Sequence, residues 1–410
     1  MKHTTLVRAG VGVTVLSVVV GLSACGSRGD DSGGATGTAG ATKKAVIGVI
    51  APLSGDLNAM GLGIQHSVEL AVKQANDAQA IPGWTLSVSA KDDESKPEPG
   101  KNGATQLAGD DNVVGVVGTL NSSVAAPVQP VLNSANIAMV SPANTNPTLT
   151  RGANPDSPQR LYANYFRTCT TDAVQGPFAA QYLIKKGITK VATVHDKKTY
   201  GQGLVEAFSK EFTAKGGQIV TAQTINPDDS NYAAAISQVK AAGPQAVYFG
   251  GEHPQAGPLS QQVHAAGLMV PIMGGDGIYD ANFIKLAGAQ ATGDLATSVG
   301  APLDTLPKGK DFLNAYNAAG YKEPPSAYGA YAYDAAQAII EALKTSLKDA
   351  PNAKEARKAT IEAVGKVSLD GLTGKVAFDE YGDSTTRVLT VYKVEDGKWV
   401  ADETSEFGKN

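Results

Sequence analysis

The sequence predicts an α/β protein made of two doubly wound lobes, each a parallel sheet covered by helices. Short apolar runs alternate with segments of helical spacing through most of the chain, which is typical of parallel strands joined by crossover helices. This alternation occurs in two successive series. The 410 residues also exceed the length that one hydrophobic core usually serves, so two lobes are expected.

The first series of elements extends from residue 45 to residue 140. Pro52 and Gly55 close the apolar run 45–50, and apolar residues at helical spacing follow over 64–78. The pattern then predicts strands and helices in turn, at 85–90, 101–108, 113–117, 123–134 and 138–140. Each crossover returns the chain to the same end of the sheet, so the sheet is expected to be parallel.

The second series begins after the segment 160–168. Helices and strands are predicted to alternate at 173–186, 190–195, 203–215, 218–224, 232–242, 246–249, 256–266 and 271–273. Three more helices are expected at 310–319, 331–347 and 354–364, followed by an alternating strand at 387–394. A strand that follows so many helices is expected to complete a sheet already begun, so the chain crosses between the lobes more than once.

Composition excludes several classes of protein. The formal net charge is −4, with both signs interspersed, so the chain has no basic stripe for nucleic acid. Beyond the N-terminal segment, no apolar run is long enough to cross a membrane. Cys169 is the only cysteine besides Cys25, so neither an internal disulfide nor a cysteine metal cluster is expected. We expect no cofactor.

The N-terminal residues 1–24 predict an export signal. A short basic segment precedes an apolar stretch at 9–20 that is too short to span a bilayer. Leu22-Ser23-Ala24-Cys25 resembles the lipobox of bacterial lipoproteins, in which the thiol accepts a diacylglycerol; a chance buried cysteine is the alternative. Residues 25–42 are mostly small and polar and are interpreted as a flexible tether. We therefore expect a lipid-anchored protein on the extracytoplasmic face of a cell membrane.

The loops that follow the strands are the candidate binding segments, because ligands of open parallel sheets lie beyond the carboxyl ends of the strands. Leu120-Asn-Ser-Ser123 leads into a helix, where backbone N–H groups and the hydroxyl of Ser122 or Ser123 would hold a carboxylate. Simple capping of that helix is the alternative. The loop 141–145 offers carbonyls and the Thr145 hydroxyl at the same end. Neither loop decides the function alone.

Signatures of catalysis are missing from the sequence. No Gly-x-Ser-x-Gly elbow occurs, and the five histidines show neither i,i+4 pairing nor a HExxH string. Gly61-Leu-Gly63 and Gly201-Gln-Gly203 lack the third glycine of a dinucleotide turn, so we interpret them as loop glycines beside helix starts. His195-Asp196 follows a strand and is the one pair that acid-base chemistry would suit. An enzyme is not expected.

A set of short strings occurs in order from about residue 44 to the C-terminus. They are Ala51-Pro-Leu-Ser-Gly55, Asp92-Asp93, Val117-Gly-Thr-Leu-Asn-Ser-Ser123, Val140-Ser-Pro-Ala143, Val194-His-Asp-Lys197, Tyr200-Gly-Gln-Gly203, Tyr248-Phe-Gly-Gly251, His253-Pro254 and Met273-Gly-Gly-Asp-Gly277. Their order and spacing resemble those of the leucine/isoleucine/valine-binding proteins, which are ABC-transporter receptors with the type I periplasmic-binding fold. The resemblance covers essentially the whole body of the chain.

The resemblance implies a receptor with two lobes joined by three hinge strands. The N-terminal lobe would comprise 43–168 plus about 300–387, and the C-terminal lobe 169–299 plus about 388–410. The lobes would close over a free amino acid, with leucine, isoleucine or valine as the first expectation, and present it to an ABC permease. We expect a monomer. The alternative is a receptor that senses amino acids, amides or related small molecules and signals without transport.

The resemblance also implies roles for residues around the cleft. Ser122 and Thr145 match positions that hold the ligand carboxylate. The carbonyl of Ala143 and the side chain of Asp276 match those that hold the ligand ammonium, and Tyr200 matches an aromatic residue contributed by the second lobe. A free amino acid presents one anion and one cation close together, so donors at a helix start must face acceptors across a small gap.

This chain departs from the family pattern at several of these positions. Met60 and Tyr328 match the pocket for the ligand side chain, or they are ordinary core residues, and an aromatic residue is frequent where Met60 stands. Gram-negative members pair two cysteines where this chain has Ser95 and Asn121. Glu252 stands where those proteins have a tyrosine that lines the site. A carboxylate facing an aliphatic side chain is costly to desolvate, so Glu252 points to the ammonium, to solvent or to a more polar ligand.

Overall fold

The computed structural model describes residues 42–154 and 157–408. These residues form a five-stranded sheet, a seven-stranded sheet and a small two-stranded sheet. The predicted signal segment 1–24, Cys25 and the predicted tether up to residue 41 lie outside the described residues. Within the described part of the chain, no helix combines the length and apolarity needed to cross a membrane.

The first sheet is parallel throughout, in the order β2-β1-β3-β4-β5. Its strands are β1 (Lys43–Ala51), β2 (Trp84–Asp92), β3 (Val113–Gly118), β4 (Ala138–Ser141) and β5 (Tyr165–Arg167). The central strands β1, β3 and β4 are almost entirely buried. They consist mainly of apolar residues without polar alternation, as expected for strands covered on both faces. The parallel sheet predicted for the first series is confirmed.

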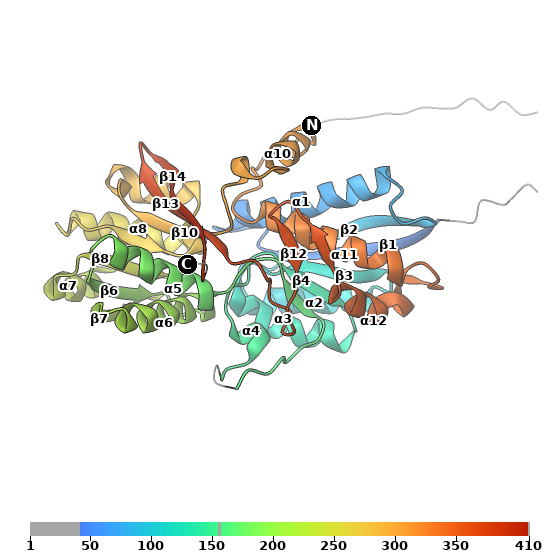
Figure 1. The fold of residues 1–410 in the computed structure, drawn as a ribbon, viewed down its shortest axis with the longest axis horizontal. Helices are drawn as coiled ribbons and strands as arrows, with labels where there is room; N and C mark the ends of the chain where they lie inside the picture. The colour runs from blue at the N-terminus through green and yellow to red at the C-terminus, as the bar shows by residue number, and fades with distance from the viewer. Residues whose placement is uncertain (1–41, 155–156, 409–410) are drawn as a thin grey trace, which may run out of the picture. The chain divides into compact units, whose positions relative to one another are not determined.

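Helices cover both faces of the first sheet (Figure 1). Side chains of β1 alternate between two cores: Ile47 and Val49 pack with α1, α11 and α12, whereas Val46 and Ile50 pack with α2 and α3. The helices that cover this sheet are α1 (Asn58–Asp77), α2 (Pro97–Gly109), α3 (Ser122–Ser134), α11 (Gly329–Ser346) and α12 (Ala353–Val364); the one-turn α4 (Thr148–Arg151) precedes β5. Two covering helices thus come from a segment of the chain that follows the second sheet's parallel strands.

The second sheet has the order β14-β13-β10-β9-β8-β6-β7. Its strands are β6 (Lys190–His195), β7 (Gln218–Thr224), β8 (Ala246–Gly250), β9 (Ile272–Gly274), β10 (Leu295–Val299), β13 (Val388–Glu395) and β14 (Lys398–Glu406). The first five are parallel, whereas β13 runs antiparallel to β10 and β14 antiparallel to β13. The prediction that the late strand joins a sheet already begun is confirmed, and its direction is reversed.

Helices also cover both faces of the second sheet. They are α5 (Asp172–Lys185) and α6 (Thr199–Ala214) in one core, and α7 (Ala233–Ala242), α8 (His253–Ala265) and α9 (Ala281–Ala287) in the other. The remaining elements are short or peripheral: η1 (Asp276–Ile278), η2 (Gly288–Ala291), η3 (Leu303–Thr305), α10 (Gly309–Ala318), β11 (Ser368–Asp370) and β12 (Lys375–Ala377).

Within the described residues, the chain passes between the two main sheets three times. The crossings follow β5, β10 and the short sheet β11-β12. Backbone hydrogen bonds join the third crossing to the other two. Gly300 N, after β10, donates to Val388 O at 2.8 Å, and Arg167 N, at the end of β5, donates to Gly382 O at 3.0 Å. In Figure 1 the red β13 and β14 therefore lie beside the yellow part of the chain, and the orange α11 and α12 lie over blue and cyan strands.

Several elements differ from the sequence prediction. β10 is a short, fully buried strand, and β14 is an exposed edge strand of mixed polarity, so neither shows clear periodicity; neither was predicted. The interpretation of Gly61 and Gly201 as loop glycines is wrong, because both lie inside helices, as do Gly63 and Gly203. A Cβ at Gly61 would lie 1.8 Å from the Pro52 carbonyl oxygen, and one at Gly201 2.4 Å from Asp196 Oδ1. Close packing therefore requires these glycines, and both helices begin earlier than their apolar pattern.

Candidate functional site

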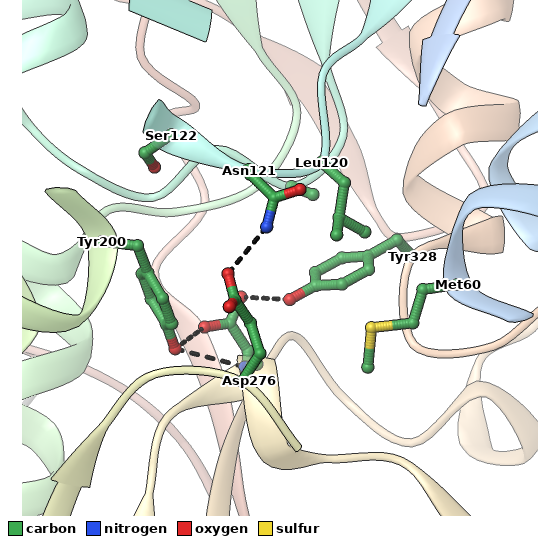
Figure 2. Close-up of a pocket in the computed structure, with 10 residues that line it drawn as sticks. Met60, Leu120, Asn121, Ser122, Tyr200, Asp276 and Tyr328 are labelled. Atoms are coloured by element: carbon green, nitrogen blue, oxygen red, sulfur yellow. Dashed lines mark hydrogen bonds between the residues drawn. The ribbon is translucent and has the colours of Figure 1, made fainter. Parts of the chain in front are cut away.

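A small cavity lies where the carboxyl ends of strands from both main sheets meet, the position expected for ligands of open parallel sheets. Its volume of about 20 Å³ has room for about one water molecule. Figure 2 shows side chains from both sheets converging on it. The lining residues are Met60, Leu120, Asn121, Ser122, Ala143, Tyr200, Glu252, Asp276, Gly277 and Tyr328.

The cavity gathers every predicted ligand-binding residue except Thr145. Thr145 is buried just behind the lining, and its carbonyl accepts the N–H of Asp172 at 2.8 Å. Three of the lining residues lie in the first turn of a helix: Ser122 begins α3, Tyr200 is in the first turn of α6, and Asp276 begins η1. Each of these follows a strand directly, which is why segments far apart in sequence meet here.

Asp276 is the centre of the polar network in this cavity. Its Oδ1 accepts hydrogen bonds from Tyr200 Oη at 2.8 Å and from Gln175 Nε2 at 2.9 Å. Its Oδ2 accepts one from Tyr328 Oη at 2.9 Å. Both tyrosine hydroxyls point at the carboxylate in Figure 2. The carboxylate is thus held in one orientation by donors from both sides of the cleft.

Gln175 links Asp276 to a second buried carboxylate. Its amide nitrogen donates to Asp276 Oδ1 and, at 3.1 Å, to Asp172 Oδ1. Its carbonyl oxygen accepts from Asp276 N at 3.0 Å and from Thr297 Oγ1 at 2.8 Å. The amide is therefore fixed by four groups, and its nitrogen bridges the two carboxyl groups.

Burial raises the pKa values of these carboxyl groups. For Asp276 burial is the main cause, and the hydrogen bonds from Gln175, Tyr200 and Tyr328 oppose the increase. For Asp172 burial and the charge of Asp276 raise the pKa to about 8. Among residues 42–154 and 157–408, no lysine, arginine or histidine lies within ion-pair distance of Asp276. A cation that entered this cavity would compensate a buried negative charge.

Glu252 forms a second polar group on the cavity wall. Its Oε1 accepts a hydrogen bond from Asn121 Nδ2 at 2.7 Å, and its Oε2 pairs with Lys198 Nζ at 2.8 Å. Burial alone would lower the pKa of Lys198, but the Glu252 carboxylate raises it above the ordinary lysine value. Asp196 lies 3.9 Å from the same ammonium, and burial and the Glu252 charge raise its pKa to about 7. Glu252 is thus 5% exposed, and among the described residues its carboxylate pairs with Asn121 and Lys198 rather than with solvent.

Apolar groups form the remaining wall. Met60 is 1% exposed, and with Leu120 it lies on the Tyr328 side of the cavity, across from Tyr200 in Figure 2. Both the position of Met60 and its burial are consistent with either of its predicted roles, pocket lining or core.

Arg167 positions the loop that carries Ala143 and Thr145. The guanidinium is fully buried, and its Nη1 donates to the carbonyls of Asn144 and, at 3.1 Å, of Asn146. Its Nε lies 2.9 Å from Asp383 Oδ1, in the third crossing segment. A buried charge bound to loop carbonyls and to a carboxylate keeps this loop in place relative to the crossing.

Sequence reasoning did not assign a site role to four residues of these networks. Asn121 was noted only as a departure from the family pattern, and Asp172, Gln175 and Lys198 were not singled out. A possible signal was the polar pair Asp172 and Gln175, which lies three residues apart in the first turn of α5, where side chains share one face. Their partners come from segments that the sequence does not place beside them.

His195 and Cys169 do not line the cavity. His195 Nδ1 accepts the Lys197 N–H at 3.1 Å, and partial burial lowers the pKa of His195. Cys169 is fully buried, and burial raises its pKa. The described residues contain no group of three or more side chains that would hold a metal ion.

Comparisons with known proteins place this geometry among related chains. The sequence matches the family model described as periplasmic binding protein over residues 44–398. Leu/Ile/Val-binding protein homolog 3 of Brucella melitensis is 33% identical over 360 residues, which cover 86% of this chain and 92% of that protein. Leu/Ile/Val-binding protein BraC3 of Rhizobium johnstonii is 34% identical over 364 residues, covering 87% and 93%.

A solved structure shows the same arrangement of elements. The branched-chain amino acid transporter substrate binding protein LivJ from Streptococcus pneumoniae, in complex with isoleucine, superposes with a TM-score of 0.78 at 27% identity. The superposition covers 89% of this chain and 100% of that one. The match to the family model extends from β1 to the start of β14, so it includes the first sheet and every strand of the second except β14.

Proposed function

We infer the function from one premise, that this chain belongs to the periplasmic binding protein family. It has the type I fold of that family and is a solute-binding receptor. We propose that its solute is a free amino acid, captured between the two lobes and delivered to the permease of an ABC importer. The names of the relatives make leucine, isoleucine and valine the first ligands to test.

One observation carries the proposal of an amino-acid ligand. Asp276 is a buried carboxylate at the junction of the lobes, with hydrogen-bond donors on both oxygens and no cationic side chain within ion-pair distance among the described residues. A ligand ammonium would supply the missing charge, and the gain would be large because the site is withdrawn from water. The helix start at Ser122, beside the loop of Ala143 and Thr145, supports a carboxylate subsite opposite.

The proposed roles follow from these positions. Ser122 and Thr145 hold the ligand carboxylate, the Ala143 carbonyl and Asp276 hold the ammonium, and Tyr200 closes from the second lobe. Met60, Tyr328 and Glu252 surround the ligand side chain. These contacts form on closure about the three crossing segments, which we propose as the hinge between lobes 43–168 plus 300–387 and 169–299 plus 388–410.

We further propose that the receptor is a monomer that releases its ligand unchanged. It is held on the extracytoplasmic face of the membrane by acyl chains on Cys25. More than one chain is needed for stable anchoring.

Calorimetry on the purified full-length protein tests the proposal. Free L-amino acids are titrated against their N-acetyl derivatives, which keep the carboxylate and side chain but lack the ammonium. We expect at least one free amino acid to bind and its N-acetyl derivative not to bind. Equal binding of the two forms would contradict the ammonium subsite. Recovery of a chemically altered ligand would contradict the receptor assignment, and unimpaired uptake without the protein would favour sensing over transport.

A further inference from the structure

Asn121 and Glu252 make a polar wall that the two lobes build together. Asn121 precedes α3 in the first lobe and Glu252 precedes α8 in the second, 131 positions later. Neither side chain caps the helix that it precedes. Both line the cavity instead, and they bond to each other at 2.7 Å.

One hydrogen-bond acceptor in this polar wall, the side-chain oxygen of Asn121, has no partner among the described residues. Glu252 Oε1 accepts a hydrogen bond from Asn121 Nδ2, and Glu252 Oε2 accepts one from Lys198 Nζ. Asn121 Oδ1 is buried and has no hydrogen-bond partner within the described part of the chain. Asn121 is 4% exposed and Glu252 is 5% exposed. Such buried polar atoms are costly when unpaired, so a ligand group that donates to them gains affinity.

Space and hydrogen bonding compete at this wall. The cavity has room for about one water molecule, and Asn121 and Glu252 are in contact on its wall, so a ligand side chain that enters at this wall would separate them. An aliphatic side chain that separates them leaves an amide N–H and a carboxylate oxygen unpaired. A carboxamide inserted between them restores both bonds, since its NH₂ donates to Glu252 and its carbonyl accepts from Asn121.

The local charge favours a neutral ligand side chain. Lys198 already pairs with Glu252 at 2.8 Å, so a cationic side chain would meet a carboxylate whose charge is compensated and an ammonium beside it. An anionic side chain would face the Glu252 carboxylate directly. A neutral group with both a donor and an acceptor meets neither penalty.

We propose that Asn121 and Glu252 select an amino acid whose side chain ends in a carboxamide over one with an aliphatic side chain of the same shape. This selection rests on the proposed function, because it assumes that the α-amino and α-carboxyl groups bind at Asp276 and Ser122. It names the chemical class of the side chain for the same site.

L-asparagine and L-leucine are the matched probes, because they differ mainly in whether the branched end of the side chain is an amide or two methyl groups. Calorimetry on the full-length protein should show asparagine binding tighter than leucine by about tenfold or more. In Glu252→Met the ratio should reverse. Glu206→Met is the control, because Glu206 is an exposed residue of α6 that bonds only Gln202 among the described residues. It should keep the wild-type ratio.

The outcomes separate this selection from the proposed function. Leucine binding tighter than asparagine in the wild type would overturn the selection and leave the amino-acid receptor intact. An unchanged asparagine preference in Glu252→Met would also overturn it. If that variant does not fold, Asn121→Leu gives the same test with the same expected reversal. Binding of neither probe by folded wild-type protein would overturn the selection, and binding of no free amino acid would overturn the proposed function with it.

Discussion

The hydroxyl of Tyr328 donates to Oδ2 of Asp276 at 2.9 Å, although the two residues are 52 positions apart in the sequence. Tyr328 precedes α11, which covers the first sheet, and Asp276 follows β9 of the second. The bond therefore joins elements that belong to the two main sheets. It also gives Asp276 Oδ2 a donor in a buried site, where an unpaired oxygen would be costly.

Tyr328→Phe should weaken this contact without changing the shape of the cavity. We expect the free energy of unfolding to fall by about 1–3 kcal/mol, because a buried carboxylate oxygen loses its donor. Thermal unfolding followed by circular dichroism measures the change. An unchanged melting temperature would show that the hydroxyl contributes nothing to lobe contact.

Asp276→Ala should abolish most amino-acid binding. The ligand ammonium would remain unpaired in a closed site, so affinity should fall by about two orders of magnitude or more. Calorimetry with the tightest-binding amino acid measures the loss. Asp276→Asn is the companion variant, because it keeps the shape and removes the charge; wild-type affinity in Asp276→Asn would assign the ammonium to another group.

Arg167→Met should be strongly destabilising. The substitution removes the buried donor of the loop carbonyls of Asn144 and Asn146 and one of the two arginines paired with Asp383, which keeps Arg151, at a cost of about 3 kcal/mol. The control is Lys73→Met, which removes an ion pair whose side chains are 66% and 63% exposed, and should cost no more than about 1 kcal/mol. Urea unfolding of both variants gives the comparison, and similar losses would refute the structural role of Arg167.

Asp172 should make the folded state less stable as the pH rises. Its folded pKa of about 8 lies above the ordinary aspartate value of 3.8, so between these values the folded protein holds a proton that the unfolded chain releases. The contribution of Asp172 to the free energy of unfolding is therefore fully present below the pKa of the unfolded state. It is lost as the pH rises through the pKa of the folded state. Its total size is on the order of a few kcal/mol.

Asp172→Asn should accordingly flatten the decline in melting temperature between about pH 5 and about pH 8. Asp77→Asn, at an exposed aspartate of α1, should leave the slope as in the wild type. Parallel slopes for Asp172→Asn and the wild type would show that Asp172 does not govern this dependence.

Cys25→Ser should release the protein from membranes. Serine lacks the thiol that the proposed lipidation requires, so the proposed acyl chains would be absent. Cell fractionation and immunoblotting measure the distribution, with Cys169→Ser as the control. Continued membrane association of Cys25→Ser, with Cys169→Ser unchanged, would contradict anchoring at Cys25.

Much of the fold was predictable because parallel strands buried on both faces are apolar runs between helices. β1 and β3 are of this kind. β14 was not predictable, because an exposed edge strand carries no such pattern. The starts of α1 and α6 were placed too late because Gly61 and Gly201 interrupt the apolar periodicity that marks a helix.

The lining of the cavity was predictable where its residues follow strands or match the family pattern, as Ser122 and Asp276 do. Partnerships between distant segments were not. Gln175 lies 101 positions from Asp276, and Asn121 lies 131 positions from Glu252, so no local spacing relates them. Glu252 stood out as a departure from the family pattern, but its partners became evident only from the packing of the lobes.

The three crossings between the sheets also govern the order in which the protein can be completed during synthesis. The first sheet is made early, but α11 and α12, which cover one of its faces, emerge only with residues 329–364. The second sheet lacks β13, which lies between β10 and β14, until residues 388–395 emerge. Growth from the N-terminus therefore leaves both halves unfinished until the chain is almost complete. No single cut in the polypeptide separates it into two fragments that each contain one whole sheet with its covering helices.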